Sequence, residues 1–194
     1  MTATHVDPNE PRFPVPLVGF AAFSGTGKTT LLTQLLPLLK ARGLRIAVVK
    51  HAHHAFDVDQ PGKDSYQLRK AGADVMLVAS RKRCALIQEC REEHDEPRLS
   101  EALAMLNPET LDLVLVEGFK REPIPKIELH RSDLGKPLLF PRDANVIAVA
   151  CDRDVLEPMP DGLPCLSIND PGQVAEFLID YIGWQAPPLS GTAG

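Results

Sequence analysis

A glycine-rich stretch that ends in lysine and two threonines is the clearest candidate for chemistry in this chain. It closes the pattern Gly-x-x-x-x-Gly-Lys-Ser/Thr, in which backbone N–H groups cradle phosphates, the lysine reaches the β- and γ-phosphates, and the hydroxyl binds Mg²⁺. Glycine is needed wherever the backbone itself touches phosphate, because a side chain there blocks the approach. The expected nucleotide-binding residues are Ser24, Gly25, Thr26, Gly27, Lys28, Thr29 and Thr30.

The first glycine of that pattern is missing, and Ala22 stands in its place. This position ends an apolar run, before the loop turns around the anion. Alanine is tolerated there if the backbone keeps a negative φ, because only positive φ strongly demands glycine. We therefore expect the phosphate site to survive the substitution.

A magnesium nucleotide also needs an acid. The segment LDLVLVEGF offers Asp112 and Glu117 at opposite ends of one apolar strand, roughly 16 Å apart at about 3.3 Å per residue. Ligands of such sheets bind at the carboxyl ends of the strands. We therefore expect Glu117, with Thr29, to bind Mg²⁺, and Gly118 to give the backbone room to turn beside the γ-phosphate.

The hydrophobic pattern alternates between strands and helices, which indicates an α/β fold with a largely parallel sheet. Two consecutive strand-like runs around the charged residues 81–83 predict an added antiparallel hairpin. The expected strands are 15–23, 44–50, 74–79, 84–90, 111–118, 126–131 and 145–151, of which the first two are predicted to be buried. One expected helix begins at residue 28, and three others cover 63–71, 98–106 and 172–183.

Composition narrows the class of protein. The 194 residues carry a net charge of -5, which does not suit general nucleic-acid binding, and no apolar run is long enough for a membrane span. The four cysteines lack metal-site spacing and are expected to be buried free thiols in the reducing cytoplasm. Proline-rich ends predict flexible tails at 1–13 and 185–194 around one domain at 14–184.

Three segments together resemble one known family. AFSGTGKTTLL, VVKHAHHAFDVDQPGKDSYQLRKAGA and LDLVLVEGFKREPIPKIELHR are similar to the molybdopterin-guanine dinucleotide biosynthesis protein B family (MobB), over about residues 15–183. The resemblance implies a phosphate-loop NTPase-like, three-layer fold and a dimeric GTP-binding adapter with Mg²⁺. The implied partner is the guanylyltransferase that joins GMP from GTP to molybdopterin. No guanine-reading signature is visible, so the guanine preference is implied by the family alone.

A histidine-rich stretch after the second strand has three readings that stay open. It is a polar exposed loop, a phosphate or pterin site, or a metal site for zinc, nickel or copper. The residues concerned are Lys50, His51, His53, His54 and Lys63. Asp59, close by, is a further candidate for the magnesium site. Molybdopterin itself is a candidate ligand of this stretch.

Two other function classes compete with the adapter. A small-molecule kinase would use the γ-phosphate, although Lys120 and Arg121 are the only basic pair near the site and no lid-like segment stands out. A metal-delivery GTPase is supported by the histidines alone. Fast hydrolysis needs a residue that orients water, and no glutamine follows Gly118. We therefore expect slow GTP hydrolysis at most.

Overall fold

The computed structural model describes residues 13–52, 56–90, 96–152 and 159–186. They fall into two compact units, one that runs to His51 and resumes at Arg98, and one that is Ala52–Pro97. The sequence patterns indicated one domain and gave no sign that residues 52–97 form a unit of their own. Of the expected tails, residues 1–12 and 187–194 lie outside the described residues.

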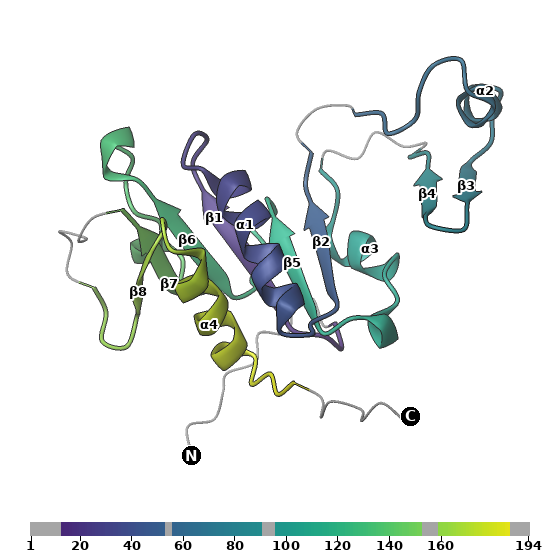
Figure 1. Ribbon diagram of the computed structural model, residues 1–194. Coiled ribbons are helices and arrows are strands. Elements are labelled where there is room, and N and C mark those ends of the chain that lie inside the picture. The colour runs from purple at the N-terminus through teal and green to yellow at the C-terminus, as the bar shows by residue number, and fades with distance from the viewer. Residues whose placement is uncertain (1–12, 53–55, 91–95, 153–158, 187–194) are drawn as a thin grey trace, which may run out of the picture. The chain divides into compact units, whose positions relative to one another are not determined.

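The first unit is built on a six-stranded sheet in the order β2-β5-β1-β6-β7-β8 (Figure 1), and every neighbouring pair is parallel. Its strands are β1 (Leu17–Ala22), β2 (Ile46–Lys50), β5 (Leu113–Glu117), β6 (Lys126–His130), β7 (Val146–Cys151) and β8 (Cys165–Ser167). All six residues of β1 are buried, as the continuous apolar run predicted. The α/β class with a largely parallel sheet is confirmed.

Helices cover both faces of this sheet. Successive residues of a strand point to opposite faces, and in the central strands both sets are apolar, so both faces need to be covered. On one face, α1 (Lys28–Ala41) and α4 (Pro171–Tyr181) lie side by side in front of the strands (Figure 1) and pack with Leu113 and Leu115. On the other, α3 (Leu99–Ala104) packs with Val114 and Val116. The phosphate-loop segment thus connects a fully buried strand to a helix anchored in the main core.

The second expected buried strand is an edge strand. β2 pairs only with β5 among the described residues, and Val48 is 45% exposed. Its apolar run was typical of a central strand, but its place in the sheet leaves one side without a neighbour. Two further elements were not predicted: the three-residue β8, and short 3-10 helices such as Ser132–Leu134.

The second unit holds α2 (Asp64–Lys70) and the predicted hairpin, β3 (Val75–Ala79) and β4 (Cys84–Gln88). The two strands are antiparallel and form a sheet of their own, rather than extending the main one. The turn is closed by Ser80 N–H, which donates to Arg83 O at 2.8 Å. The unit thus contributes the antiparallel part of the fold.

One charged residue lies in the interior of this small unit. Arg69 is 8% exposed and pairs with Asp57 at 2.7 Å, with Asp59 at 3.4 Å, and with Glu89. The pKa of Asp57 is lowered, mainly by a hydrogen bond from the Asp59 backbone; desolvation opposes this shift, and the charge of Arg69 adds to it. A buried arginine is tolerated only with such partners, so this cluster is part of the unit's core.

The cysteines depart from expectation in one respect. All four are free thiols, but only Cys151 is buried, while Cys84, Cys90 and Cys165 are exposed.

In the described residues, no helix has the length and apolar character needed to cross a membrane.

Candidate nucleotide site

The loop between β1 and α1 has the backbone that a phosphate cradle requires. Gly25 and Gly27 have φ angles of 84° and 93°, in the left-handed region that side chains disfavour. Thr26, between them, is 2% exposed, and its hydroxyl donates to Phe23 O at 2.8 Å. The Thr26 backbone N–H donates to the same Phe23 carbonyl at 3.4 Å. The loop is therefore preset by two glycines and these internal hydrogen bonds, with Ser24 and Gly25 on its exposed side.

The loop leads into a helix whose amino end has no side-chain cap. Gly27 is the N-cap of α1 and makes no side-chain cap hydrogen bond, and no acidic residue lies in the first turn. Those N–H groups and the helix dipole together favour an anion. Lys28 begins the helix, and Thr29 and Thr30 follow it with exposed side chains. Each predicted loop residue thus lies at the helix end where phosphate is expected.

Glu117 ends β5 beside this loop. Its carboxylate lies 3.4 Å from Lys28 Nζ and 3.6 Å from Lys50 Nζ, and its side chain is 15% exposed. Register explains the meeting, because Glu117 pairs with Phe20 of β1 on one side and with Lys50 of β2 on the other. The Glu117 carboxylate is thus the anionic partner of both lysines, and it lies near the phosphate loop.

The turn after Glu117 has an unusual backbone. Gly118 has φ 87°, and a Cβ there would lie 2.6 Å from His51 Cβ, so only glycine fits. Phe119 follows with φ 48°, a rare conformation for a bulky residue, and its ring stacks on His51 at 5.0 Å between centroids. His51 N–H also donates to Glu117 O at 2.8 Å. Such strain concentrates at functional sites and needs surrounding contacts to hold it.

The structure also places Ala22, which replaces the first glycine of the phosphate-loop pattern, and Asp112, the other acid of the β5 segment. Ala22 is the last residue of β1, is 2% exposed, and does not have a positive φ. Asp112 precedes β5 at the opposite end from Glu117, where Arg45 Nη2 lies 2.8 Å from it. Asp112 is therefore engaged in an ion pair far from the loop.

The remaining predicted residues are not all assembled here. Asp59 and Lys63 belong to the second unit, where Asp59 accepts a hydrogen bond from Ser65 at 2.9 Å and Lys63 precedes α2. His53 and His54 lie outside the described residues. In the part of the chain that is described, no group of three or more His, Cys, Asp or Glu residues could hold a metal ion.

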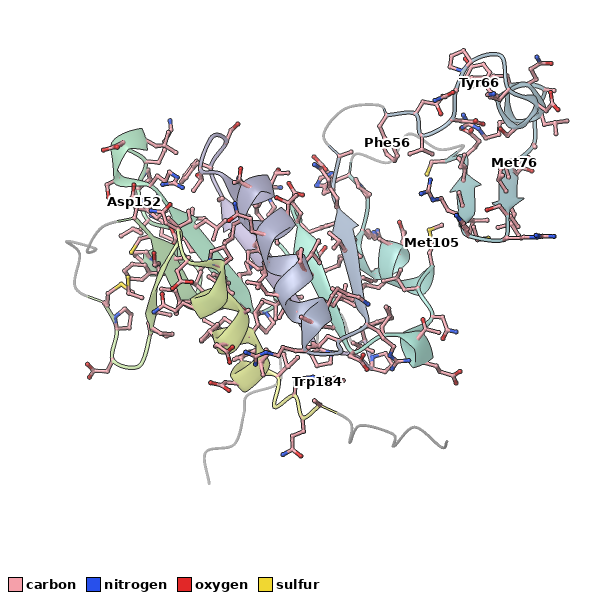
Figure 2. All side chains as sticks on the ribbon, viewed as in Figure 1. Phe56, Tyr66, Met76, Met105, Asp152 and Trp184 are labelled. Carbon is pink, nitrogen blue, oxygen red and sulfur yellow. The ribbon has the colours of Figure 1, made fainter. Side chains whose placement is uncertain are left out.

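Sequence reasoning missed a polar cluster on the other side of the loop. Arg131, which follows β6, donates from Nε to Thr26 O at 3.0 Å and from Nη2 to Asn169 Oδ1 at 3.1 Å. Its Nη1 lies 3.7 Å from Asp152, which directly follows β7 and is labelled in Figure 2. A hydrogen bond from the Ser132 backbone is the main cause that lowers the pKa of Asp152. The available signal was the presence of polar residues just after parallel strands.

A parallel sheet whose buried first strand leads through a glycine loop into an uncapped helix defines the class of P-loop α/β proteins. Residues 17–152 match the family described as molybdopterin guanine dinucleotide synthesis protein B. The chain therefore belongs to the molybdopterin guanine dinucleotide synthesis protein B family.

Relatives and solved structures agree with this assignment. The molybdopterin-guanine dinucleotide biosynthesis adapter protein of Escherichia coli (strain K12) is 48% identical over 169 residues, which are 87% of this chain and 94% of that protein. The corresponding protein of Haemophilus influenzae is 43% identical over 170 residues, with coverages of 87% and 90%. The crystal structure of molybdopterin-guanine biosynthesis protein B (mobB) matches with TM-score 0.63 and 29% identity, covering 85% of this chain and 99% of that one.

Proposed function

We propose that this protein binds GTP with Mg²⁺ and acts as an adapter for the guanylyltransferase that attaches GMP to molybdopterin. The observation that carries the nucleotide part is the preset glycine loop at the uncapped amino end of α1, with Lys28 beside it. The relatives of similar length, named as adapter proteins of molybdopterin-guanine dinucleotide biosynthesis, support the pathway and the adapter role.

The residues of the first unit suit a magnesium triphosphate. Backbone N–H groups of residues 24–29 would hold phosphate oxygens, and Lys28 would neutralise the β- and γ-phosphates. Thr29 offers an exposed hydroxyl, and Glu117 a carboxylate, to Mg²⁺ or to its bound water. The ion pair between Lys28 and Glu117 keeps both groups in place near the loop.

The histidine-rich segment is proposed as the side that meets pterin or the partner enzyme. Lys50, at the end of β2, is 61% exposed and lies 3.6 Å from Glu117, at the same sheet edge as the phosphate loop. His51 follows it directly and contacts the turn after Glu117. Cationic and aromatic groups of this kind suit a phosphorylated pterin. Lys63, His53 and His54 are proposed for the same role.

A homodimer is also proposed, and the hairpin is its proposed interface. Val75, Leu77 and Leu86 are 52%, 59% and 48% exposed, which is unusual for a two-stranded sheet in water. Each strand pairs only with the other among the described residues, so both outer edges are open to a second copy.

Calorimetric titration with GTP and Mg²⁺ tests the nucleotide site. We expect Lys28→Ala to abolish tight binding, because it removes the charge next to the phosphates, and to leave thermal unfolding unchanged. Lys40→Ala, an exposed lysine in the last turn of the same helix, is the matched control and should bind as the wild type does. Unaltered affinity in Lys28→Ala would remove the phosphate-loop assignment.

A further inference from the structure

Polar side chains lie at the carboxyl ends of β6, β7 and β8. The proposed binding of the phosphates and Mg²⁺ does not use them. Strand order places β5 and β6 on opposite sides of β1. A triphosphate in the loop with its γ end toward Glu117 therefore directs its nucleoside across the loop, over the ends of β6, β7 and β8. This inference rests on the GTP binding proposed above.

Arg131 connects the phosphate loop to this second area. Its guanidinium donates to the carbonyl of Thr26, and its Nη2 would lie 3.7 Å from a Cβ on Gly27. Asp152 lies on its remaining side at 3.7 Å. The side chain is thus held between the loop and the end of β7, and it is still 34% exposed. It forms a fixed wall next to the place where phosphate and nucleoside meet.

Asn169 is oriented by this arginine. A guanidinium has donors only, so the Asn169 group that faces it at 3.1 Å is the carbonyl oxygen. The amide nitrogen must then point away from Arg131. Asn169 is exposed, and within the described residues no acceptor is bonded to Nδ2. Its own backbone is fixed as well, because its N–H donates to Ser167 Oγ at 3.3 Å.

A purine ring can be distinguished by such an oriented donor. Guanine presents two acceptors, N7 and O6, on one edge, whereas adenine presents the acceptor N7 and an amino donor. A fixed amide NH₂ group can donate to N7 or O6 of guanine. On adenine the same group faces the amino group, which is also a donor. We propose that Asn169 selects guanine by donating from Nδ2 to this edge, and that Arg131 is the positioning residue that sets the amide's orientation.

Replacement of the amide by a carboxylate tests the selection. Asn169→Asp keeps the acceptor for Arg131 but removes the donor, so it repels O6 and accepts from the adenine amino group. We expect GTP affinity to fall tenfold or more, because leaving one hydrogen-bonding group unpaired costs about 1–3 kcal/mol and about 1.4 kcal/mol is tenfold. We expect ATP affinity to be kept or to rise. ITP shares N7 and O6 with GTP, so it should follow GTP in both proteins.

Two controls separate base recognition from damage to the loop. Inorganic tripolyphosphate has no base, and its affinity should be the same in wild type and Asn169→Asp. Asn107→Asp makes the same chemical change before β5, where the side-chain oxygen caps a short helix by accepting from Glu109 N–H at 3.1 Å. This control should keep the wild-type preference for GTP.

The outcomes discriminate between the two proposals. A wild-type protein that binds no nucleoside triphosphate contradicts both GTP binding and base recognition. A wild type that prefers GTP, with an unchanged ratio of GTP to ATP affinity in Asn169→Asp, overturns only the role of Asn169. Equal loss of GTP, ATP and tripolyphosphate affinity also overturns it, because the residue would then act on the loop.

Discussion

Glu117 is the residue at which the metal assignment can be tested alone. We expect Glu117→Gln to reduce the gain in GTP affinity that Mg²⁺ provides by at least tenfold, or about 1.4 kcal/mol, because the amide keeps the shape and loses the charge. Titrations of GTP with and without Mg²⁺ give this ratio. Asp112→Asn, at the other end of the same strand, is the control, and equal effects of the two changes would contradict the choice of Glu117.

Phe119 bears on the rate of hydrolysis. It occupies the position after Gly118, is 7% exposed, and stacks on His51, so it offers no polar group to an attacking water. We expect phosphate release from saturating GTP with Mg²⁺ at roughly 10⁻⁴ to 10⁻² s⁻¹, as for GTPases without an activator. Purified protein without partners is the sample. Turnover above about 1 s⁻¹, in the range of kinases, would favour the enzyme alternative.

At the residue scale, the sequence predicted the position of those site residues that belong to a single motif or to the end of a single strand. Lys28 beside Glu117 is such a pair, and the structure brings them to 3.4 Å. Arg131 and Asn169 were not predicted, because they meet across separate strands and their sequence neighbourhood carries no motif. Contacts of that kind depend on strand order, which local patterns do not encode.

At the scale of elements, the ion pair of Arg45 with Asp112 joins the starts of β2 and β5, at the opposite end from the ion pair of Lys50 with Glu117. Arg45, just before β2, donates to Asp112 from both its backbone and its guanidinium, at 2.7 and 2.8 Å. The side-chain hydrogen bond from Arg45 is the main cause that lowers the pKa of Asp112. The Asp112 side chain is 12% exposed and the Arg45 side chain is 52% exposed, so solvent screens the pair from the arginine side.

The stability of the sheet edge should therefore depend on pH through Asp112. A carboxyl group with a lowered folded-state pKa stabilises the protein above its unfolded pKa of about 3.9 and loses that contribution as the pH falls through the folded value. We expect Asp112→Asn to lower the free energy of unfolding at pH 7 by about 0.5–1 kcal/mol, the range of a solvent-screened ion pair. Urea unfolding from pH 7 toward pH 3 should show this difference shrinking. A constant difference, or an equal loss in the exposed control Asp161→Asn, would contradict it.

Elements were predictable where the hydrophobic period was long or continuous. β1, α1 and the hairpin came out at their expected places, and boundaries moved by a few residues. β2 was predicted as buried because its composition is that of a central strand, and its edge position is a property of the whole sheet. β8 has three residues, which is too short for a period to show.

At the scale of the whole molecule, the proposed dimer can be tested at the hairpin. Leu77 and Leu86 pair across β3 and β4, and both side chains are largely exposed. We expect light scattering at micromolar concentration to give a dimer, and Leu77→Asp with Leu86→Asp to give a monomer that still binds GTP. Leu38→Asp, at an exposed leucine of α1, should remain dimeric. A monomeric wild type would contradict the proposal.

The division into two units was the largest feature that the sequence did not reveal. Residues 52–97 contain ordinary helix and strand patterns, and among the described residues of this unit the buried one is an arginine paired with three carboxylates, not an apolar stripe. Charged residues in a sequence usually indicate surface, so this kind of core cannot be distinguished from a solvated face by composition.

The adapter role is tested most directly by formation of the guanine dinucleotide cofactor itself. The assay contains a purified molybdenum cofactor guanylyltransferase, molybdopterin, Mg²⁺ and GTP at a limiting concentration, and the product is measured with time. The proposed function predicts that wild-type protein raises the rate severalfold, that Lys28→Ala does not, and that saturating GTP diminishes the difference. A rate that the wild-type protein leaves unchanged, or that Lys28→Ala raises equally, would contradict a GTP-presenting adapter.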